Sequence, residues 1–286
     1  MKKVLVSLAI GEQYAELDRT TAPFREAWAA RHGWDCETIR ELPSWFLERH
    51  SSEGAKSAST LYKLLIPGAF AAYDLVAFCD LDAFMNPDAP CLTTYEDQIP
   101  EGGFAAANDL PFEKRAVCFP EWEVDYYVEL EKRIGAKLDL PSREQSMNSG
   151  LMVYRPSEVA DRWQKLADMD TPLNEENRLN VFEVQQGKCF FLPLEWNVVW
   201  QYYVREHFPY LQRPARHNRW IHRANTLIAR TIGAPIERRH LMATLAKSHV
   251  LHLAFQRAKA GLLRGVDPGR IALARDNRLP RLRLYL

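Results

Sequence analysis

The sequence YDLVAFCDLDAFMNPDAP, residues 73–90, decides the expected fold. Its apolar run at 75–79 is typical of a strand that is buried on both faces of a parallel sheet. The run ends in two acids, Asp80 and Asp82, with one leucine between them. In parallel α/β sheets, ligands bind beyond the carboxyl ends of the strands. The two aspartates are therefore the first candidate functional residues.

Two carboxylates this close repel each other unless a positive charge lies between them or one is protonated. A divalent cation is the usual positive partner, and Mn²⁺ and Mg²⁺ accept hard oxygen ligands while keeping positions for phosphate oxygens. A reading without a metal is also open, in which Asp80 and Asp82 cap the turn that leads into residues 86–88.

Strands and helices are predicted to alternate along the rest of the chain. Strands are expected at 2–10, 36–42, 75–79, 103–108, 149–155, 189–193 and 247–255. The first helix is expected to begin at a cap, Thr20 or Thr21, to include Pro23 early and to end at Gly33. A loop is expected at 43–57, followed by a helix over 57–73 with a break at Pro67. Further helices are expected over 121–138, 156–169 and 175–187. This alternation predicts an α/β fold with a mainly parallel central sheet flanked by helices.

The length of 286 residues suits one large α/β domain, and the apolar fraction of 47% is ordinary for a globular protein. A catalytic domain is expected over 1–255, with an Arg-rich helical insertion at about 205–247 and a basic tail at 256–286. No stretch approaches 18 apolar residues, and the apolar start reads as a strand rather than a leader. The five cysteines show no metal or disulfide spacing, which predicts a reducing, cytoplasmic setting.

The charges are unevenly distributed along the chain. Residues 1–204 carry 20 Lys and Arg against 33 Asp and Glu, whereas residues 205–286 carry 17 against 4. The two parts can neutralise each other within the fold, or the basic end can meet phosphate on a nucleotide or an anionic lipid surface. A peripheral contact of the tail with the inner face of the membrane is therefore one open role. The acidic first part argues against a nucleic-acid partner.

Two other families carry a similar string after a strand. Haloacid-dehalogenase phosphatases have Asp-x-Asp, followed by a Gly-Thr pair where this chain has Ala83 and Phe84. Lesion-bypass polymerases carry a DxDAFF string near their start, whereas here it begins at Asp80. Both families are kept as weaker alternatives.

The longer segment STLYKLLIPGAFAAYDLVAFCDLDAFMNPDA, residues 59–89, resembles the metal-motif region of GT-A glycosyltransferases. The likeness is to the glycogenin and bacterial lipopolysaccharide galactosyltransferase group, called family 8. MNSGLMVYRP at 147–156, EENRLNVFEVQQGKCFFLPLEWNVV at 175–199 and SHVLHLAF at 248–255 resemble later motifs of that group in the same order. REAWAARHGWDCETI at 25–39 is also similar to the fungal and plant galactosyl- and mannosyltransferase group. The resemblance covers residues 2–255.

The resemblance implies a GT-A fold and a metal-dependent glycosyltransferase. The expected reaction moves a hexose from a nucleotide sugar, with UDP as the expected nucleotide, to a glycan or glycoconjugate acceptor with retention of anomeric configuration. The expected ligands of Mn²⁺ or Mg²⁺ are Asp80, Asp82 and His252. His249, three residues earlier, is not expected to be a ligand.

The resemblance also implies residues that bind the donor nucleotide. The uridine is expected against the end of the first strand, and the diphosphate against basic side chains and the acidic turn. These positions are Ala9, Ile10, Gly11, Tyr14, Lys63, Asp80, Leu81 and Lys259. The family has a Gly and a Lys at the positions that Phe255 and Ala258 occupy in this chain, and the lysine here comes one residue later, at Lys259. Arg257 is therefore an alternative to Lys259 for binding the diphosphate.

Three further residues are implied at the donor sugar. Asn148 is expected to hydrogen-bond the sugar, and Glu175 to bind its hydroxyls. Glu176 stands where the family has an amide near the anomeric carbon, and it acts as a nucleophile in one variant of the mechanism. Four aromatic side chains can either form a floor for an acceptor sugar or pack in the core, as aromatic residues more often do, namely Trp196, Trp200, Tyr202 and Tyr203.

Two alternative functions remain open. A GT-A relative that binds a nucleotide sugar or a carbohydrate without turnover would carry the same residues. A nucleotidyltransferase is disfavoured, because the segment after the first strand, GEQYAELDR at 11–19, is acidic where a Gly-rich basic loop would be needed.

Overall fold

The computed structural model describes residues 1–50, 54–108, 147–171, 173–200, 203, 234–254 and 257–271, with the backbone alone at 54–57, 234–236 and 257–259. The helix expected at 121–138, most of the Arg-rich insertion and about half of the basic tail (256 and 272–286) lie outside these ranges. The described ranges include the strands and helices that surround Asp80 and Asp82.

A six-stranded sheet forms the centre of the molecule. In spatial order its strands are β2 (Asp35–Ile39), β1 (Lys3–Leu8), β3 (Leu75–Cys79), β6 (Met147–Tyr154), β5 (Phe104–Asn108) and β7 (Cys189–Leu192). Only β6 is antiparallel to its neighbours, so the other five strands run in one direction. The predicted, mainly parallel sheet is confirmed, and the carboxyl ends of β1, β3 and β5 lie along one edge.

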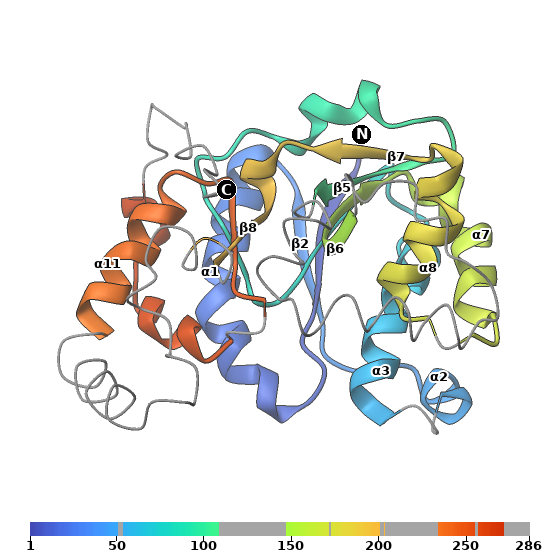
Figure 1. The fold of residues 1–286 in the computed structure, drawn as a ribbon, viewed down its shortest axis with the longest axis horizontal. Coiled ribbons are helices and arrows are strands. Elements are labelled where there is room, and N and C mark those ends of the chain that lie inside the picture. The colour runs from blue at the N-terminus through green and yellow to red at the C-terminus, as the bar shows by residue number, and fades with distance from the viewer. Residues whose placement is uncertain are drawn as a thin grey trace, which may run out of the picture.

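Helices cover both faces of this sheet (Figure 1). On one side lies α1 (Ala15–His32). On the other lie α2 (Ser44–Arg49), α3 (Gly54–Leu61), α4 (Ile66–Ala69), α7 (Pro156–Asp168) and α8 (Glu175–Phe182). Successive side chains of a strand point to opposite faces, and accordingly Val4 and Val6 join one hydrophobic cluster while Leu5 joins another.

A second, three-stranded sheet carries the late part of the chain to the acidic pair. It consists of β4 (Ala83–Met85), β9 (Val250–His252) and β8 (Val198–Val199), with β9 in the middle. Its hydrophobic residues pack with α1 and α11 (Ala234–Leu245). In the antiparallel pairing of β4 with β9, Ala83 lies opposite His252. This register places the histidine next to the aspartates.

The start of α1 differs from the prediction. The helix begins at Ala15, and Thr20 and Thr21 lie inside it. Their hydroxyls donate to carbonyl oxygens one turn earlier instead of capping the helix. The predicted end is confirmed, because Gly33 adopts a left-handed φ of 65° as a C-terminal cap.

The predicted loop at 43–57 is wrong, because α2 and the start of α3 lie within it. Phe46 is fully buried and anchors α2 to the core, a tertiary contact that outweighs the polar composition of the segment. The expected helix at 57–73 is divided by a 3-10 turn at Tyr62–Leu65, and Pro67 stands in the first turn of α4, where its missing N–H costs no helical hydrogen bond.

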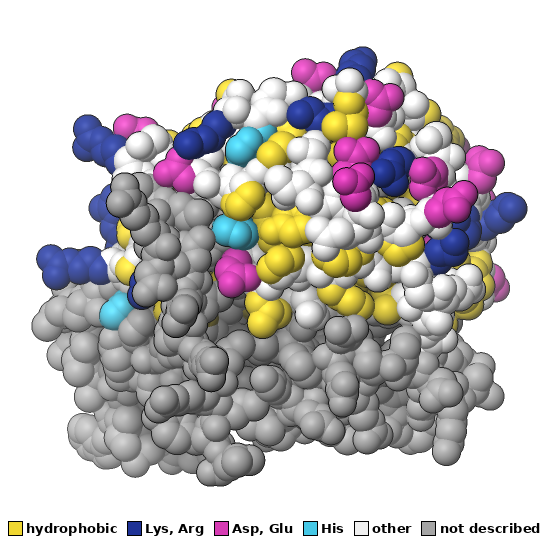
Figure 2. Space-filling view, turned by 90° about the horizontal axis from the view of Figure 1, so that it is seen from above, with side chains coloured by type: hydrophobic (Ala, Val, Ile, Leu, Met, Phe, Trp, Pro, Cys, Tyr) yellow, Lys and Arg dark blue, Asp and Glu magenta, His cyan; other side chains and the backbone are white. Residues whose placement is uncertain are grey.

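The surface of the described part carries both signs of charge. On the face in Figure 2, acidic and basic side chains are interspersed with hydrophobic ones. None of the helices in the described ranges has both the length and the apolar character that a membrane crossing requires.

Arg178 of α8 connects α8 to α7. Its buried guanidinium donates from Nε to the carbonyl of Leu173 at 2.7 Å and from Nη1 to the carbonyls of Leu166 and Ala167, which belong to the last turn of α7. It thus satisfies carbonyl groups that the end of a helix leaves without partners. This contact fixes the position of the first turn of α8.

We expect Arg178→Met to lower the free energy of unfolding by about 2–4 kcal/mol, because it leaves several buried carbonyls unsatisfied. Urea denaturation measures this. The matched control is Arg49→Met, which removes a half-exposed ion pair to Asp168 (2.8 Å) and should cost less than about 1 kcal/mol. Equal losses in the two variants would contradict the proposed role of Arg178.

Candidate functional site

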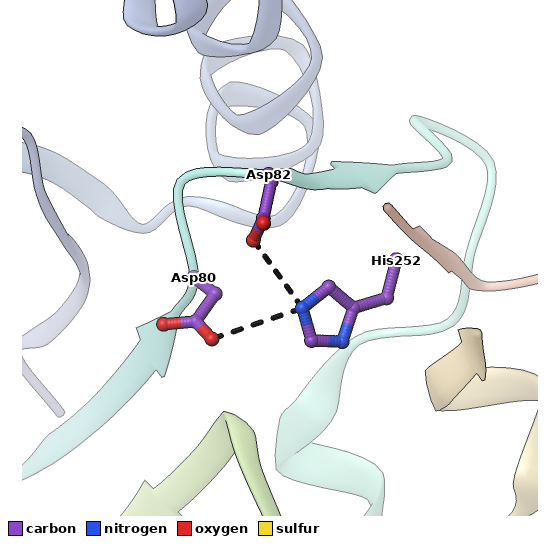
Figure 3. Close-up of side chains that lie close together, drawn as sticks. All are labelled: Asp80, Asp82 and His252. Carbon is purple, nitrogen blue, oxygen red and sulfur yellow. Dashed lines mark ion pairs between the residues drawn. The ribbon is translucent and has the colours of Figure 1, made fainter. Parts of the chain in front are cut away.

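The acidic turn is closed by its backbone. The N–H of Asp80 donates to the carbonyl of Gly150 in β6 (2.8 Å), and the N–H of Ala83 donates to the carbonyl of Asp80 (3.1 Å). The N–H of Leu253, just after β9, donates to the carbonyl of Asp82 (2.9 Å). Both aspartate side chains then point toward His252 (Figure 3).

Asp80, Asp82 and His252 form a compact cluster. His252 Nε2 lies 3.3 Å from Asp82 Oδ1 and 3.7 Å from Asp80 Oδ2. One potential ligand atom from each residue lies within 4.8 Å of the others. Two carboxylate oxygens suit a hard divalent cation, and the imidazole nitrogen adds a ligand of the kind that transition metals accept. The three residues that the sequence suggested as ligands are thus together, and their chemistry fits a divalent cation.

The protonation of His252 reflects these neighbours. Burial lowers the pKa of the imidazole, but the hydrogen bond to Asp82 and the charges of Asp82 and Asp80 raise it by more, so the pKa lies above its ordinary value of 6.5. Because a histidine ligand must be neutral, a cation at this site would replace the proton on Nε2.

Gly150 makes room for the imidazole. A Cβ at this position would lie 2.6 Å from His252 Cε1 and 2.6 Å from Asn148 Oδ1. Such distances are well inside van der Waals contact, so no other residue fits without displacing its neighbours. Sequence reasoning missed Gly150, although a glycine inside a strand is a recognised sign of close approach.

Lys63 is a buried cation between two acids. Its Nζ lies 2.9 Å from Asp80 Oδ1 and 3.2 Å from Glu175 Oε1, and it donates to Ser149 Oγ at 3.1 Å. Burial lowers the pKa of Lys63, but the charges of Asp80 and Glu175 raise it by more. The ammonium therefore stays charged although only 6% of the residue is exposed.

Glu175 and Glu176 begin α8, and both are held by Ser149. The Ser149 hydroxyl donates to Glu175 Oε1 (3.0 Å), and the Ser149 N–H donates to Glu176 Oε2 (3.0 Å). Asn174 caps the helix by accepting the N–H of Asn177. The start of α8 is thus fixed against β6, the strand that follows β3 in the sheet.

Glu175 is ionised and incompletely paired. Burial raises the pKa of its carboxyl, but the charge of Lys63 and the hydrogen bonds from Lys63 and Ser149 lower it by more, so it lies below the ordinary 4.5. Among the described residues, its second oxygen, Oε2, is buried without a hydrogen-bond partner. A buried carboxylate oxygen without a partner carries a desolvation cost that a hydrogen-bond donor reaching it would offset.

The expected uridine positions lie at the same edge of the sheet. Ala9 and Ile10 follow β1, which pairs with β3, and the N–H of Ala9 donates to the carbonyl of Ile39. Gly11 has a φ of 95°, which favours glycine. Tyr14 is half-buried at the start of α1. The two strand ends bring these residues to the side of the molecule that carries the acidic turn.

The remaining predicted residues are placed as follows. Asn148 lies beside the cluster, and its Oδ1 accepts the N–H of Gly150 (2.9 Å). Leu81 is buried between the two aspartates. His249 is outside the cluster, with its ring against Trp196 (centroids 4.9 Å apart). The side chains of four residues lie outside the described part, namely Tyr202, Phe255, Arg257 and Lys259.

Of the two alternatives for the aromatic group, a floor for the acceptor or a place in the core, the core is confirmed for two members. Trp196 and Trp200 are fully buried, so neither presents a face to a sugar. The Nε1–H of Trp196 donates to the hydroxyl of Tyr95 (3.1 Å). Tyr203 is half-buried and stacks on Trp200. These tryptophans contribute to the core that supports the small sheet.

Comparisons with known proteins identify the fold. No protein-family model and no curated protein sequence matches the chain. A glycosyltransferase involved in glycosylation of the major capsid of PBCV-1 is similar over 92% of this chain and 100% of its own, at 10% identity and a TM-score of 0.52. The bifunctional glycosyltransferase WbbM is similar over 96% of this chain, at 14% identity and a TM-score of 0.52, and the match spans about half (52%) of WbbM. The predicted GT-A fold is thereby confirmed.

We expect Gly150→Ala to weaken Mn²⁺ binding about tenfold or more, because the added methyl group displaces the His252 ring. Electron paramagnetic resonance of free Mn²⁺ gives the affinity. Gly68→Ala is the control, since a Cβ there meets nothing within 4 Å. Unchanged affinity in a folded Gly150→Ala protein would refute the tight packing at this position.

The lowered pKa of Glu175 has a consequence for stability. Its ion pair stabilises the protein above the ordinary pKa of about 4.5, and the contribution is lost as pH falls through the lowered value. Glu175→Gln should therefore lower the free energy of unfolding by about 1–3 kcal/mol at pH 7, with a smaller difference near pH 3. Urea unfolding at both pH values tests this, with the exposed Glu41→Gln as control. A pH-independent difference would argue against an ionised, paired Glu175.

Proposed function

We propose that this protein is a metal-dependent glycosyltransferase that moves a hexose from a nucleotide sugar, a UDP-hexose, to a glycan or glycoconjugate. The observation that carries the proposal is the Asp80–Asp82–His252 cluster at the carboxyl edge of a GT-A sheet. The glycosyltransferase function of the two solved relatives supports it.

The cation, Mn²⁺ or Mg²⁺, would serve as a Lewis acid for the departing diphosphate. The role of the protein is to hold the side chains of Asp80, Asp82 and His252 at the separation and orientation that a cation requires. Lys63 binds Asp80 Oδ1, so the other oxygen, Oδ2, is the one turned toward His252. Lys63 also offsets part of the negative charge of the acidic residues, which favours the approach of an anionic donor.

The donor sugar is proposed to lie against Asn148, Glu175 and Glu176. Glu175 is held ionised and can only accept hydrogen bonds, so its buried Oε2 would accept a sugar hydroxyl. A donor sugar without a hydroxyl next to Glu175 Oε2 would leave this oxygen without a hydrogen bond. Leaving a buried polar group unpaired is the strongest way for a polar site to discriminate against a sugar that lacks the hydroxyl. The uridine is proposed to lie against Ala9, Ile10, Gly11 and Tyr14, with Leu81 and Lys259 as further contacts.

Retention of anomeric configuration is proposed from the resemblance. In a front-face mechanism the departing phosphate accepts the acceptor's proton, and no separate protein base is needed. In the variant that uses Glu176 as a nucleophile, a covalent glycosyl-enzyme forms. Mass spectrometry after reaction with a slow donor analogue distinguishes the two, because only the second leaves an adduct on Glu176.

A cytoplasmic location is also proposed. The four cysteines in the described part are free thiols, which suits a reducing compartment. Contact of the basic tail with the inner face of a membrane is a separate proposal, tested by binding of the full chain to anionic vesicles.

We expect Asp80→Asn and Asp82→Asn each to reduce Mn²⁺-dependent release of UDP from a UDP-hexose at least about 100-fold, because each removes a charged ligand. Asp74→Asn is the control, since Asp74 is an exposed aspartate just before β3. Circular dichroism verifies that the variants are folded. Metal-dependent turnover that survives in both ligand variants would contradict the assignment.

A panel of nucleotide sugars should identify the donor by thermal shift. A ligand present at about 100 times its dissociation constant stabilises the folded protein by about 2.7 kcal/mol. We expect one UDP-sugar to raise the melting temperature only when Mn²⁺ is present. A shift without any release of UDP would instead favour the non-catalytic binding protein, and no shift with any sugar nucleotide would count against both.

A further inference from the structure

Asn197 contacts the side of His252 that faces away from the aspartates. Its Oδ1 lies 3.0 Å from His252 Nδ1, and only 7% of the residue is exposed. It ends the 3-10 turn Leu194–Asn197 directly before β8, which pairs with β9. The contact is therefore fixed by the small sheet that also carries His252.

The orientation of the Asn197 amide follows from its second contact. Its Nδ2 donates to the carbonyl of Asn108 at the end of β5 (3.4 Å), so the oxygen end is the one turned toward the imidazole. An amide oxygen only accepts hydrogen bonds, so His252 Nδ1 must carry a proton. The lone pair of a neutral His252 is then on Nε2, the atom that faces Asp80 and Asp82.

We infer that Asn197 is a positioning residue that holds the Nδ1–H of His252, so that Nε2 is the nitrogen offered to a cation between Asp80 and Asp82. The inference rests on the proposed function, because it presumes that a cation binds there. Gly150 leaves room for the ring in this orientation, since a Cβ there would lie 2.6 Å from Cε1 and 3.0 Å from Nδ1. Hydrogen-bond partners of metal-binding histidines commonly fix the ring in this way.

The test measures Mn²⁺ affinity without donor or acceptor, so it does not depend on turnover. Asn197→Leu has a similar volume but no acceptor for Nδ1–H. We expect its Mn²⁺ dissociation constant to rise about 10- to 100-fold. The control is Asn86→Leu, which removes a buried amide that bonds the carbonyls of Leu245 and Ser248 and should leave the affinity within about threefold.

A second variant separates positioning from a structural role. Asn197→Asp keeps an oxygen for Nδ1–H but loses the donor to Asn108. If Asn197 positions the ring, the Mn²⁺ affinity of Asn197→Asp should stay within about threefold of the wild type, because the carboxylate accepts the same hydrogen bond from Nδ1–H. A merely structural role predicts that Asp is as damaging as Leu. This variant decides the question even if Asn197→Leu does not fold.

A double-mutant cycle shows whether the effect passes through His252. In a His252→Ala protein only the two aspartates would remain to bind Mn²⁺, and the affinity would be weaker. Adding Asn197→Leu to this protein should change the Mn²⁺ affinity less than about twofold. The inference is overturned if Asn197→Leu binds Mn²⁺ like the wild type, if Asn197→Asp loses as much as Asn197→Leu, or if the loss persists without His252. A wild-type protein that binds no Mn²⁺ would overturn the proposed function as well, so the two failures are distinguishable.

Discussion

Repulsion among carboxylates is the constraint on which the site depends. Asp80, Asp82, Glu175 and Glu176 converge at one edge of the sheet, where they destabilise one another unless positive charge lies among them. Lys63 supplies one such charge between Asp80 and Glu175. On the other side both aspartates face His252, and a divalent cation placed there would be bound by all three side chains.

The fold brings these charges together from distant parts of the chain. The acidic turn follows β3, while Lys63 stands on the helical segment before it and Ser149 lies on the antiparallel strand β6. His252 reaches the turn because β9 pairs with β4. Buried charges are stable only where their partners are held in place. The pairing of strands in the two sheets therefore determines how precisely the charged side chains are positioned.

The local parts of this arrangement were predictable from the sequence. The apolar run of β3 and the acids after it identify a strand end, and the alternation of elements gives the mainly parallel sheet. His252 required a resemblance to known proteins, since no local pattern connects it to Asp82. Asn197 was missed because its contact with the imidazole exists only after folding. Gly150 carried a local sign, a glycine inside a strand, but the neighbour that approaches it is set by the tertiary structure. The start of α1 and the helices near Phe46 were mispredicted where tertiary packing outweighs local propensity.

The central claim is that a divalent cation binds between Asp80, Asp82 and His252. The most direct measurement is anomalous X-ray scattering at the manganese edge from crystals grown with Mn²⁺ and UDP. We expect one strong peak, about 2.0–2.4 Å from a carboxylate oxygen of each ligating aspartate and from His252 Nε2. A fully ordered turn with no peak, or a peak bound by other residues, would contradict the account.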